Sequence, residues 1–357
     1  MAGLKLRRAT VVEAGDPEAP FQRLAVEIAG ARRPAVADTV LVGPAQVGDD
    51  VVLNTQALDL GLGSGGFDVV HANLTRGLEG EGTAGAHVMK LNYTSLQHAV
   101  MPVEAEAAPS VGISPPVDSL AGSLEGSPAA MIFNHGQLAP VCWGVAQVAP
   151  GARVGFVQTP GGALPGGLSE VVRELRARDL LAGHVTAGAA FGGEGEAITT
   201  AGAIHHGLRD LGWDAAVTGP GPGVIGSGSA LGHGGLYALD SAHVAIALGC
   251  RALIVPRLSS GDARPRHQGL SHHTGTVLRL LLAPATVAVP EGLDVAWPAQ
   301  PIQHVWRSAP VDLDGYSASG LPTRTMGRDL EEDRAFFAAA LAGGVVLGEM
   351  VREAAPA

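Results

Sequence analysis

Short runs of apolar residues, separated by turn residues, mark the first third of the chain. The runs are four to six residues long, and glycine occurs in the segments between them. We predict strands over residues 9–13, 24–28, 38–42, 51–54, 67–72 and 87–91. No helical period connects them, and strands at this spacing are typical of a small barrel or sandwich. Residues 1–105 are therefore expected to form a small all-β, barrel-like domain.

From about residue 129 the apolar runs alternate with amphipathic stretches. The predicted strands are 130–133, 153–158, 184–187, 214–218, 252–255 and 286–289, and the predicted helices are 138–148, 168–181, 197–211, 237–248 and 272–282. This alternation indicates successive βαβ units and a mainly parallel sheet. The expected fold is therefore mixed α/β, with the barrel followed by a doubly wound, Rossmann-like domain over residues 129–330.

Two further segments complete the predicted organisation. Residues 106–128 are rich in proline, glycine and serine and show no period, which is typical of a linker. Residues 329–353 predict one helix, or two helices divided at Gly343 and Gly344, with Asp329 as a cap. We expect this C-terminal segment, within residues 331–357, to pack on the α/β domain.

Composition and charge narrow the class of protein. Glycine supplies 51 of the 357 residues, and with 46% hydrophobic residues this excess belongs in the tight loops of a folded chain. The 34 acidic and 23 basic residues give a net charge of −11, which argues against a nucleic-acid partner. No apolar run suits a membrane span or a signal peptide, and two cysteines in apolar surroundings fit a reducing compartment. A cytoplasmic protein without a membrane partner is expected.

Two missing features exclude several enzyme mechanisms. Both lysines, Lys5 and Lys90, lie in the β-rich part, so the predicted α/β domain lacks the lysine of P-loop NTPases, of pyridoxal-phosphate enzymes and of lysine-dependent aldolases. The chain also lacks a G-x-S-x-G nucleophile elbow, which disfavours an ordinary α/β-hydrolase.

The unusual segments of the second half follow predicted strands. They are residues 134–136, 159–167, 187–195, 219–235 and 257–273. In an open parallel sheet, ligands bind outside the carboxyl ends of the strands. We therefore expect a binding site at this edge of the sheet.

Glycine-rich loops are the first candidate at this edge. Gly161 and Gly162 follow one predicted strand, and Gly221, Gly223 and Gly226 follow another. Their backbone N–H groups are suited to cradle an anionic group. The alternative is a rigid loop without a ligand, because glycine mainly marks unusual backbone angles or close approach.

A dinucleotide site is disfavoured. The pattern G-x-G-x-x-G at 221–226 occurs also at 61–66, in the β-rich part, where it has no meaning as a fingerprint. The later copy does not open directly into a helix, and the next strand is followed by Arg257 rather than by an acid for the ribose. That arginine leaves NADP a weaker alternative, and the cofactor stays unknown.

Residues 257–273 concentrate cationic side chains in an acidic protein. Arg257, Arg264 and Arg266 offer the bidentate geometry that carboxylates and phosphates need. Ser271 is placed to cap a helix whose N-terminus favours an anion. The alternative is a solvated loop whose arginines pair with surface acids.

The same segment holds the candidate catalytic histidines. His267 and His272 are candidates for proton transfer, because imidazole titrates near neutrality. A metal site is the competing interpretation, and its candidate ligands are His267, His272 and His273 with Asp262, His135 or His233. Adjacent histidines on a helix point about 100° apart and no recognised ligand spacing occurs, so we assign no metal ligands.

Several stretches together carry a resemblance to a known family. They are residues 51–55, 57–66, 161–165, 190–193, 219–221 and 266–273. The chain resembles an uncharacterised bacterial family, a domain of unknown function that is common in high-GC Gram-positive bacteria. The resemblance implies no activity, cofactor or substrate. Because it includes the loop at 54–66, it allows the N-terminal domain to contribute to the same site.

Three functions remain in competition. The leading hypothesis is an enzyme that acts on a small anionic metabolite, phosphorylated or not, held by the glycine loops and the arginines. The second is a non-catalytic ligand sensor or scaffold that uses the barrel as an interaction module. The third is a structural homodimer whose glycine-rich loops only pack. A homo-oligomer is expected in each case.

Overall fold

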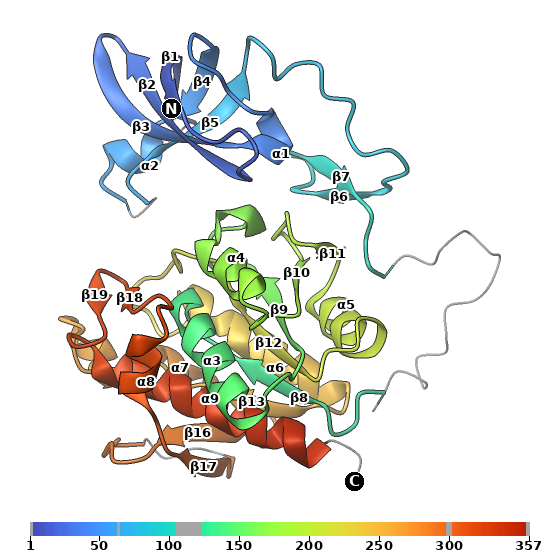
Figure 1. Cartoon of the computed structure of the whole chain (residues 1–357), viewed down its shortest axis with the longest axis vertical. Helices are drawn as coiled ribbons and strands as arrows, with labels where there is room; N and C mark the ends of the chain where they lie inside the picture. The colour runs from blue at the N-terminus through green and yellow to red at the C-terminus, as the bar shows by residue number, and fades with distance from the viewer. Residues whose placement is uncertain (1–2, 63–64, 105–122, 298–301, 355–357) are drawn as a thin grey trace. The chain divides into compact units, whose positions relative to one another are not determined.

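The computed structural model describes residues 3–62, 65–104, 123–297 and 302–354. The chain divides into two compact units, Met1–Met101 and Pro102–Ala357 (Figure 1). The predicted boundary at residue 105 lies close to this division. Most of the predicted linker, residues 106–122, lies outside the described residues.

The first unit is a closed barrel of five strands in the order β1-β2-β3-β5-β4. The strands are β1 (Leu6–Ala14), β2 (Phe21–Ile28), β3 (Ala31–Asp38), β4 (Asp50–Asn54) and β5 (Asp68–Asn73). Alternate side chains, among them Val11, Val26 and Leu53, point inward and form a buried core. The predicted all-β barrel is therefore confirmed.

One predicted strand of this unit, residues 38–42, is wrong beyond its first residue. Thr39–Val42 form the helical turn α1 because the Asp38 carboxylate accepts the backbone N–H groups of Val40 and Leu41. Gly43, with φ of 73°, then ends the turn. The turn α2 (Gln56–Asp59) and the hairpin of β6 (Val88–Lys90) and β7 (His98–Val100) complete the unit.

The second unit is built on an eight-stranded sheet in the order β11-β10-β9-β12-β8-β13-β16-β17, and every neighbouring pair is parallel. The strands are β8 (Pro128–Met131), β9 (Val154–Thr159), β10 (Gly183–Ala187), β11 (Gly195–Ala197), β12 (Ala215–Pro220), β13 (Arg251–Ile254), β16 (Thr286–Pro290) and β17 (Val305–Ala309). All six predicted strands are present. The two edge strands, β11 and β17, lack the apolar runs that would have predicted them.

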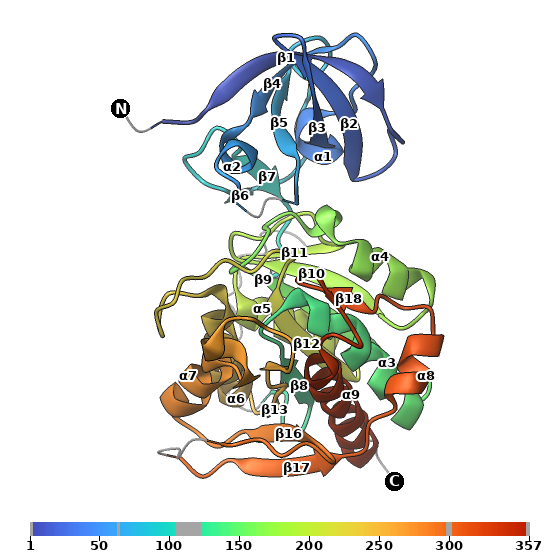
Figure 2. The ribbon, with the colours of Figure 1, turned by 90° about the vertical axis from the view of Figure 1, so that its left-hand side faces the viewer.

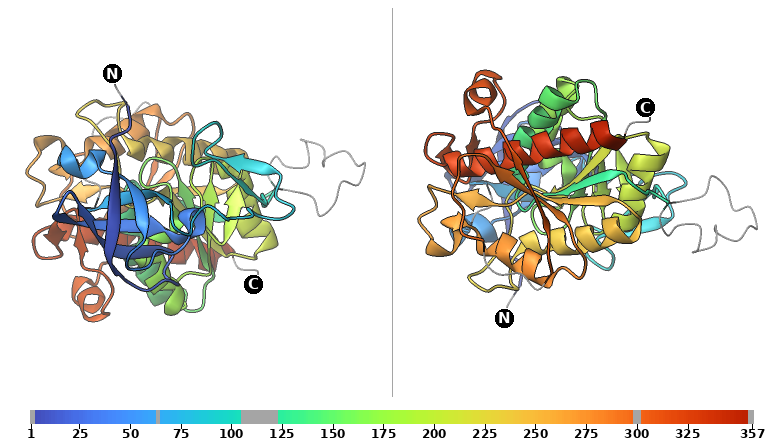
Figure 3. Two further views of the ribbon diagram at one scale, coloured as in Figure 1. Left: turned by 90° about the horizontal axis from the view of Figure 1, so that it is seen from above. Right: turned by 90° about the horizontal axis from the view of Figure 1, so that it is seen from below.

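Helices cover both faces of the sheet. They are α3 (Leu138–Val148), α4 (Glu170–Ala177), α5 (Thr200–His205), α6 (Tyr237–Ala247), α7 (His272–Leu280), α8 (Leu313–Ala318) and α9 (Arg334–Ala354). Side chains of α3, α4, α8 and α9 form one core with the sheet, and those of α5, α6 and α7 form the other. Figure 3 shows α3 and α9 on one face and α6 on the opposite face. The mixed α/β fold is confirmed.

The C-terminal helix α9 continues through Gly343 and Gly344 without a break. Its glycines serve a close crossing with α3, which lies beside it (Figure 2). A Cβ atom at Gly344 would lie 2.3 Å from the Val141 carbonyl oxygen, and one at Gly144 would lie 2.9 Å from the Leu341 carbonyl oxygen. Here glycine therefore permits backbone contact between helices rather than ending one.

Hydropathy alone would allow α9 to cross a membrane. Among the described residues it is the one helix that is long and apolar enough, yet 72% of its apolar window is buried inside the protein. Its apolar side chains, including Phe336 and Leu347, belong to the core beneath α3.

The order of the strands places three loops at one point. From β8 the chain crosses by α3 to β9 on one side, and from β12 it crosses by α6 to β13 on the other. The loops that follow β8, β12 and β13 therefore meet at the switch point, where open parallel sheets bind ligands.

Candidate functional site

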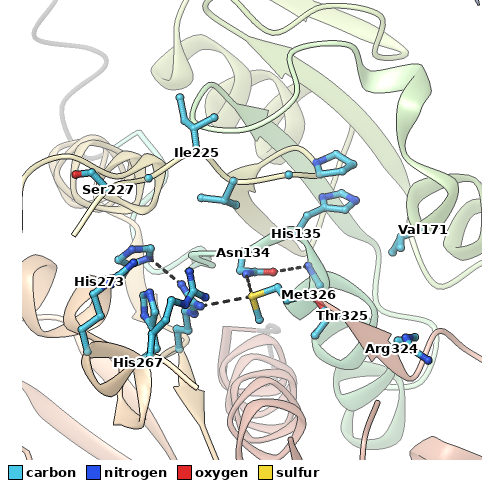
Figure 4. Close-up of a pocket in the computed structure, with 18 residues that line it drawn as sticks. Asn134, His135, Val171, Ile225, Ser227, His267, His273, Arg324, Thr325 and Met326 are labelled. Carbon is cyan, nitrogen blue, oxygen red and sulfur yellow. Dashed lines mark hydrogen bonds between the residues drawn. The ribbon is translucent and has the colours of Figure 1, made fainter. Parts of the chain in front are cut away.

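A cavity of about 490 Å³ lies at this switch point of the second unit. Its walls are residues 134–136 after β8 and 222–227 after β12, residues 324–326 of the hairpin formed by β18 (Arg324–Thr325) and β19 (Arg328–Asp329), and Val171 of α4. The segment after β13 adds Arg257, Arg264, Arg266, His267 and His273. His267 and His273 lie on one side, and His135 and Arg324 lie on the other (Figure 4).

Four arginines line this cavity, and no carboxylate of the described residues does. They are Arg257, Arg264, Arg266 and Arg324. Arg266 and Arg324 are exposed and form no ion pair with any acidic residue that the structure describes. In a protein of net charge −11, this is a local cationic surface, and it favours an anionic ligand.

The other arginines are held by one buried carboxylate, Asp262. Its Oδ2 atom lies 2.7 Å from Nη2 of Arg264 and 3.4 Å from Nη2 of both Arg257 and Arg328. The hydrogen bond from Arg264 holds the pKa of Asp262 well below its usual range. Burial lowers the pKa of Arg257 to about 10, so this guanidinium is still charged at neutral pH.

The glycine loop after β12 forms part of the cavity wall. Gly223 and Gly226 line it, and Gly223 has a φ of 68°, which side chains disfavour. The N–H groups of Gly223, Val224 and Gly226 donate to no acceptor among the residues that the structure describes. These groups are therefore available to an anion.

The loop after β9 packs against the glycine loop after β12 and holds it in place. The Ile225 N–H donates to the Gly161 carbonyl at 3.0 Å. A Cβ atom at Gly162 would lie 2.3 Å from the Gly221 carbonyl oxygen, so the two loops are in backbone contact. None of the three glycines 161, 162 and 221 lines the cavity.

Four histidine rings gather beside the arginines. They are His233, His267, His272 and His273. The rings of His272 and His273 have centroids 4.5 Å apart, so the expectation that these neighbours diverge is wrong at this helix start. Side chains there lean toward the N-terminus of α7, where His233 meets them.

Burial keeps these imidazoles neutral. It lowers the pKa of His233 to about 4, that of His267 to about 3 and that of His273 to about 2, and nearby histidines and arginines add to the shifts. The pKa of His272 is lowered by the same causes. A neutral ring can accept a hydrogen bond or bind a metal, but with so low a pKa it is a weak general base.

Several buried nitrogens of this cluster lack a partner. Neither ring nitrogen of His233 makes a hydrogen bond of ordinary geometry, although the Ala230 carbonyl is near enough to oppose the fall in the pKa of this ring. Nε2 of His272 and Nε of Arg257 are also unpartnered. By contrast, Nδ1 of His273 contacts Nη1 of Arg257 at 3.2 Å.

The predicted site residues divide into two groups. Those that line the cavity are Gly223, Gly226, Arg257, Arg264, Arg266 and His267, and those that do not are Gly161, Gly162, Gly221, Ser271 and His272. Ser271 is fully buried, lies 2.7 Å from Nδ1 of His267 and caps α7 by accepting the His273 N–H. It orders the histidines rather than facing a ligand.

Sequence reasoning missed the wall formed by residues 324–326. Met326, with φ of 51°, places its sulfur 3.1 Å from Nδ2 of Asn134 and 3.4 Å from Nη2 of Arg257. This hairpin follows no strand with an apolar run, so a search of strand ends cannot find it. The cluster of arginine, glycine and proline at 320–328 is the signal that was available.

His135, on the far side of the cavity, is fixed by two hydrogen bonds. Its Nε2 atom lies 2.6 Å from the Ser169 hydroxyl oxygen, and its Nδ1 atom lies 3.3 Å from the Pro220 carbonyl oxygen. Burial lowers the pKa of His135 to about 4. Ser169 also caps α4 by accepting the Val172 N–H, which explains its burial without a catalytic role.

Comparison with known proteins identifies a family without supplying an activity. The family model described as "Protein of unknown function (DUF3866)" matches residues 34–344, from β3 to α9. No curated protein and no solved structure matches the chain. The matched range includes every residue that lines the cavity.

Proposed function

Because this chain belongs to the DUF3866 family of proteins of unknown function, we propose its function from the site itself: an enzyme that acts on a small anionic metabolite. The observation that carries the proposal is the cavity wall, which holds four arginines and no carboxylate among the described residues. Carboxylates and phosphates are the groups that paired guanidinium and backbone N–H donors recognise.

Each donor in the cavity has a separate part in this proposal. Arg266 and Arg324 are not committed to a carboxylate and would bind the anion directly. The amides of Gly223 and Gly226 would add donors from the opposite loop. Arg264 is already oriented by Asp262, so it loses little conformational freedom on binding.

His267 is the one member of the predicted catalytic pair that lines the cavity. A bound anion would favour the charged form of this ring and raise its low pKa, and on that basis we assign proton transfer with the bound ligand to its imidazole. Its Nδ1 atom is held at 2.7 Å by Ser271, which fixes the ring orientation. Proton transfer by a positioned side chain contributes about 100-fold to 10,000-fold to a rate.

Binding and turnover are tested separately. Thermal shift and calorimetry with inorganic phosphate, pyrophosphate and a panel of phosphorylated and carboxylated metabolites should reveal binding, which weakens about tenfold or more in R266Q/R324Q. The matched control R352Q removes an exposed charge from α9, remote from this cavity, and should bind as the wild type does. Equal binding by the double variant and the wild type would contradict the anion site.

Catalysis is then assayed by following the bound compounds with NMR or mass spectrometry. We expect turnover by the wild type, and in H267Q a turnover rate lower by about 100-fold or more with the affinity for the ligand retained. Tight binding without conversion of any compound would instead favour the alternative function, a ligand sensor.

A further inference from the structure

We propose that His233, His272 and His273 together bind one divalent transition-metal ion of the zinc class. One ring nitrogen from each residue lies within 4.8 Å of the other two. His233 comes from the loop that leads into α6, and the other two begin α7. The inference rests on these three residues and does not depend on the proposed anion site.

Buried ring nitrogens that lack a hydrogen-bond partner are the second observation that points to a ligand. His233 is only 6% exposed, yet both of its ring nitrogens are buried without a hydrogen-bond partner, as is Nε2 of His272. A buried polar atom without a partner is destabilising, because it has lost its hydrogen bonds to water and gained none in the protein. An imidazole binds an ion through one nitrogen, so an ion at this point would give one nitrogen of His233 and one of His272 a partner, while the other nitrogen of His233 could donate to the Ala230 carbonyl.

The three ring nitrogens lie somewhat farther apart than the ligand atoms of a bound zinc ion would. Zinc binds imidazole nitrogen at about 2.0–2.1 Å, so ligand atoms around a tetrahedral ion lie about 3.3 Å apart. The rings of His233 and His273 are stacked, with planes 9° apart. Because the lone pair of an imidazole nitrogen lies in the ring plane, two stacked rings cannot both aim at one ion, so binding requires these rings to rotate about their side-chain torsions and leave the stack.

The chemistry of the three donors suits zinc better than calcium or magnesium. All three rings are held neutral, which is the form that binds a metal, and imidazole favours borderline ions over hard ones. Three histidine ligands with a fourth position open are typical of catalytic zinc. Because His273 also lines the cavity, the ion would lie at its wall.

Arg257 would compete with the ion for His273. Nη1 of this arginine lies 3.2 Å from Nδ1 of His273. That hydrogen bond must break whether the metal takes Nδ1 or takes Nε2, because the second case puts a proton on Nδ1. Removing the guanidinium of Arg257 removes this competitor and also a positive charge that would repel the ion. Asp262 keeps Arg264 and Arg328 as partners.

The test uses the full chain, stripped with a chelator and dialysed against zinc chloride, with bound zinc measured by mass spectrometry. We expect about one zinc per chain for the wild type and for the control H206A, which lies outside the cluster. H233F and H272Q should each weaken zinc binding at least tenfold, and R257M should tighten it. Zinc should also raise the melting temperature of the wild type but not that of H233F.

Two results would overturn the proposal: zinc binding by H233F and H272Q equal to that of the wild type, or weaker binding by R257M. If H233F does not fold, H272Q carries the test, because its ring is only partly buried. R266Q/R324Q should retain zinc, so failure of the metal site and failure of the anion site can be told apart.

Discussion

The imidazole rings of His233 and His273 stack face to face, with centroids 3.7 Å apart. His233 lies in the loop after β12 and His273 in the first turn of α7, which follows the loop after β13, so this contact joins two segments of the site. Two charged rings would repel each other at this distance, and burial holds the pKa of both residues well below neutrality. The stack therefore joins neutral aromatic surfaces.

This contact predicts different outcomes for two substitutions of His233. H233F keeps a flat ring in the stack and should change the free energy of unfolding by less than about 1 kcal/mol. H233A removes the ring and should cost about 2–3 kcal/mol, as expected for a buried side chain truncated to alanine. Urea unfolding followed by tryptophan fluorescence measures both, because all four tryptophans lie in the second unit. Equal losses would show that the stack contributes nothing.

The crossing of α3 and α9 predicts that G344A destabilises the second unit. The new methyl group would lie 2.3 Å from the Val141 carbonyl oxygen, so one helix must shift. We expect a loss of about 1–3 kcal/mol in the free energy of unfolding. G275A is the matched control, because a Cβ atom at this helical position has nothing within 4 Å and alanine favours helix. Its melting temperature should stay the same or rise, and a similar loss in both variants would contradict the steric explanation.

The ion pair between Asp49 and Arg76 should make the stability of the barrel depend on pH. Arg76 donates two hydrogen bonds of 2.7 Å to this carboxylate and lowers its pKa to about 2. The unfolded value is about 3.9, so this stabilisation is complete above about pH 4 and is lost as the pH falls toward 2. Amide NMR signals of β4 and β5 in urea titrations should report weaker stability at pH 3 than at pH 6.

D49N is the variant that checks this assignment. It should cost the barrel about 1–3 kcal/mol at pH 6, because charged hydrogen bonds to a buried group are lost. The difference from the wild type should shrink as the pH falls. A difference independent of pH would show that the loss comes from packing and not from the charge.

Replacing Asp262 is expected to lower the stability of the protein and to raise its affinity for an anion. It pairs with Arg257, Arg264 and Arg328, so it both orders the cavity wall and neutralises part of its charge. D262N should lower the melting temperature and tighten pyrophosphate binding several-fold, because one opposing charge is removed. Calorimetry and thermal unfolding measure the two effects. Weaker pyrophosphate binding would mean that orientation of the arginines matters more than their charge.

Much of the fold could be predicted from apolar periodicity. The helix predicted over 138–148 coincides with α3, and the alternation of strands and helices identified the parallel sheet. Local side-chain chemistry overrode the pattern at 38–42, where the Asp38 cap and Gly43 select a turn over a strand. The pair Gly343 and Gly344 indicated a possible break in the last helix, because glycine disfavours helix. The local sequence could not show that these glycines pack against α3, which is distant in the chain.

The candidate site could be predicted in part, for the same reason. Loops after β12 and β13 were found because they follow strands with apolar runs, and their arginines line the cavity. Arg324 and the histidine cluster depend on contacts between distant segments. His233 meets His273 only because the order of strands brings β12 near β13. Homo-oligomer formation and cytoplasmic location stay predictions.

The anion site is tested by anomalous scattering from crystals of the full chain soaked in tungstate, a heavy analogue of phosphate. We expect a tungsten peak inside the cavity, with oxygens within hydrogen-bond distance of Arg266 and of the Gly223 amide, and no such peak in R266Q/R324Q crystals. An empty cavity in crystals that bind tungstate elsewhere would contradict it.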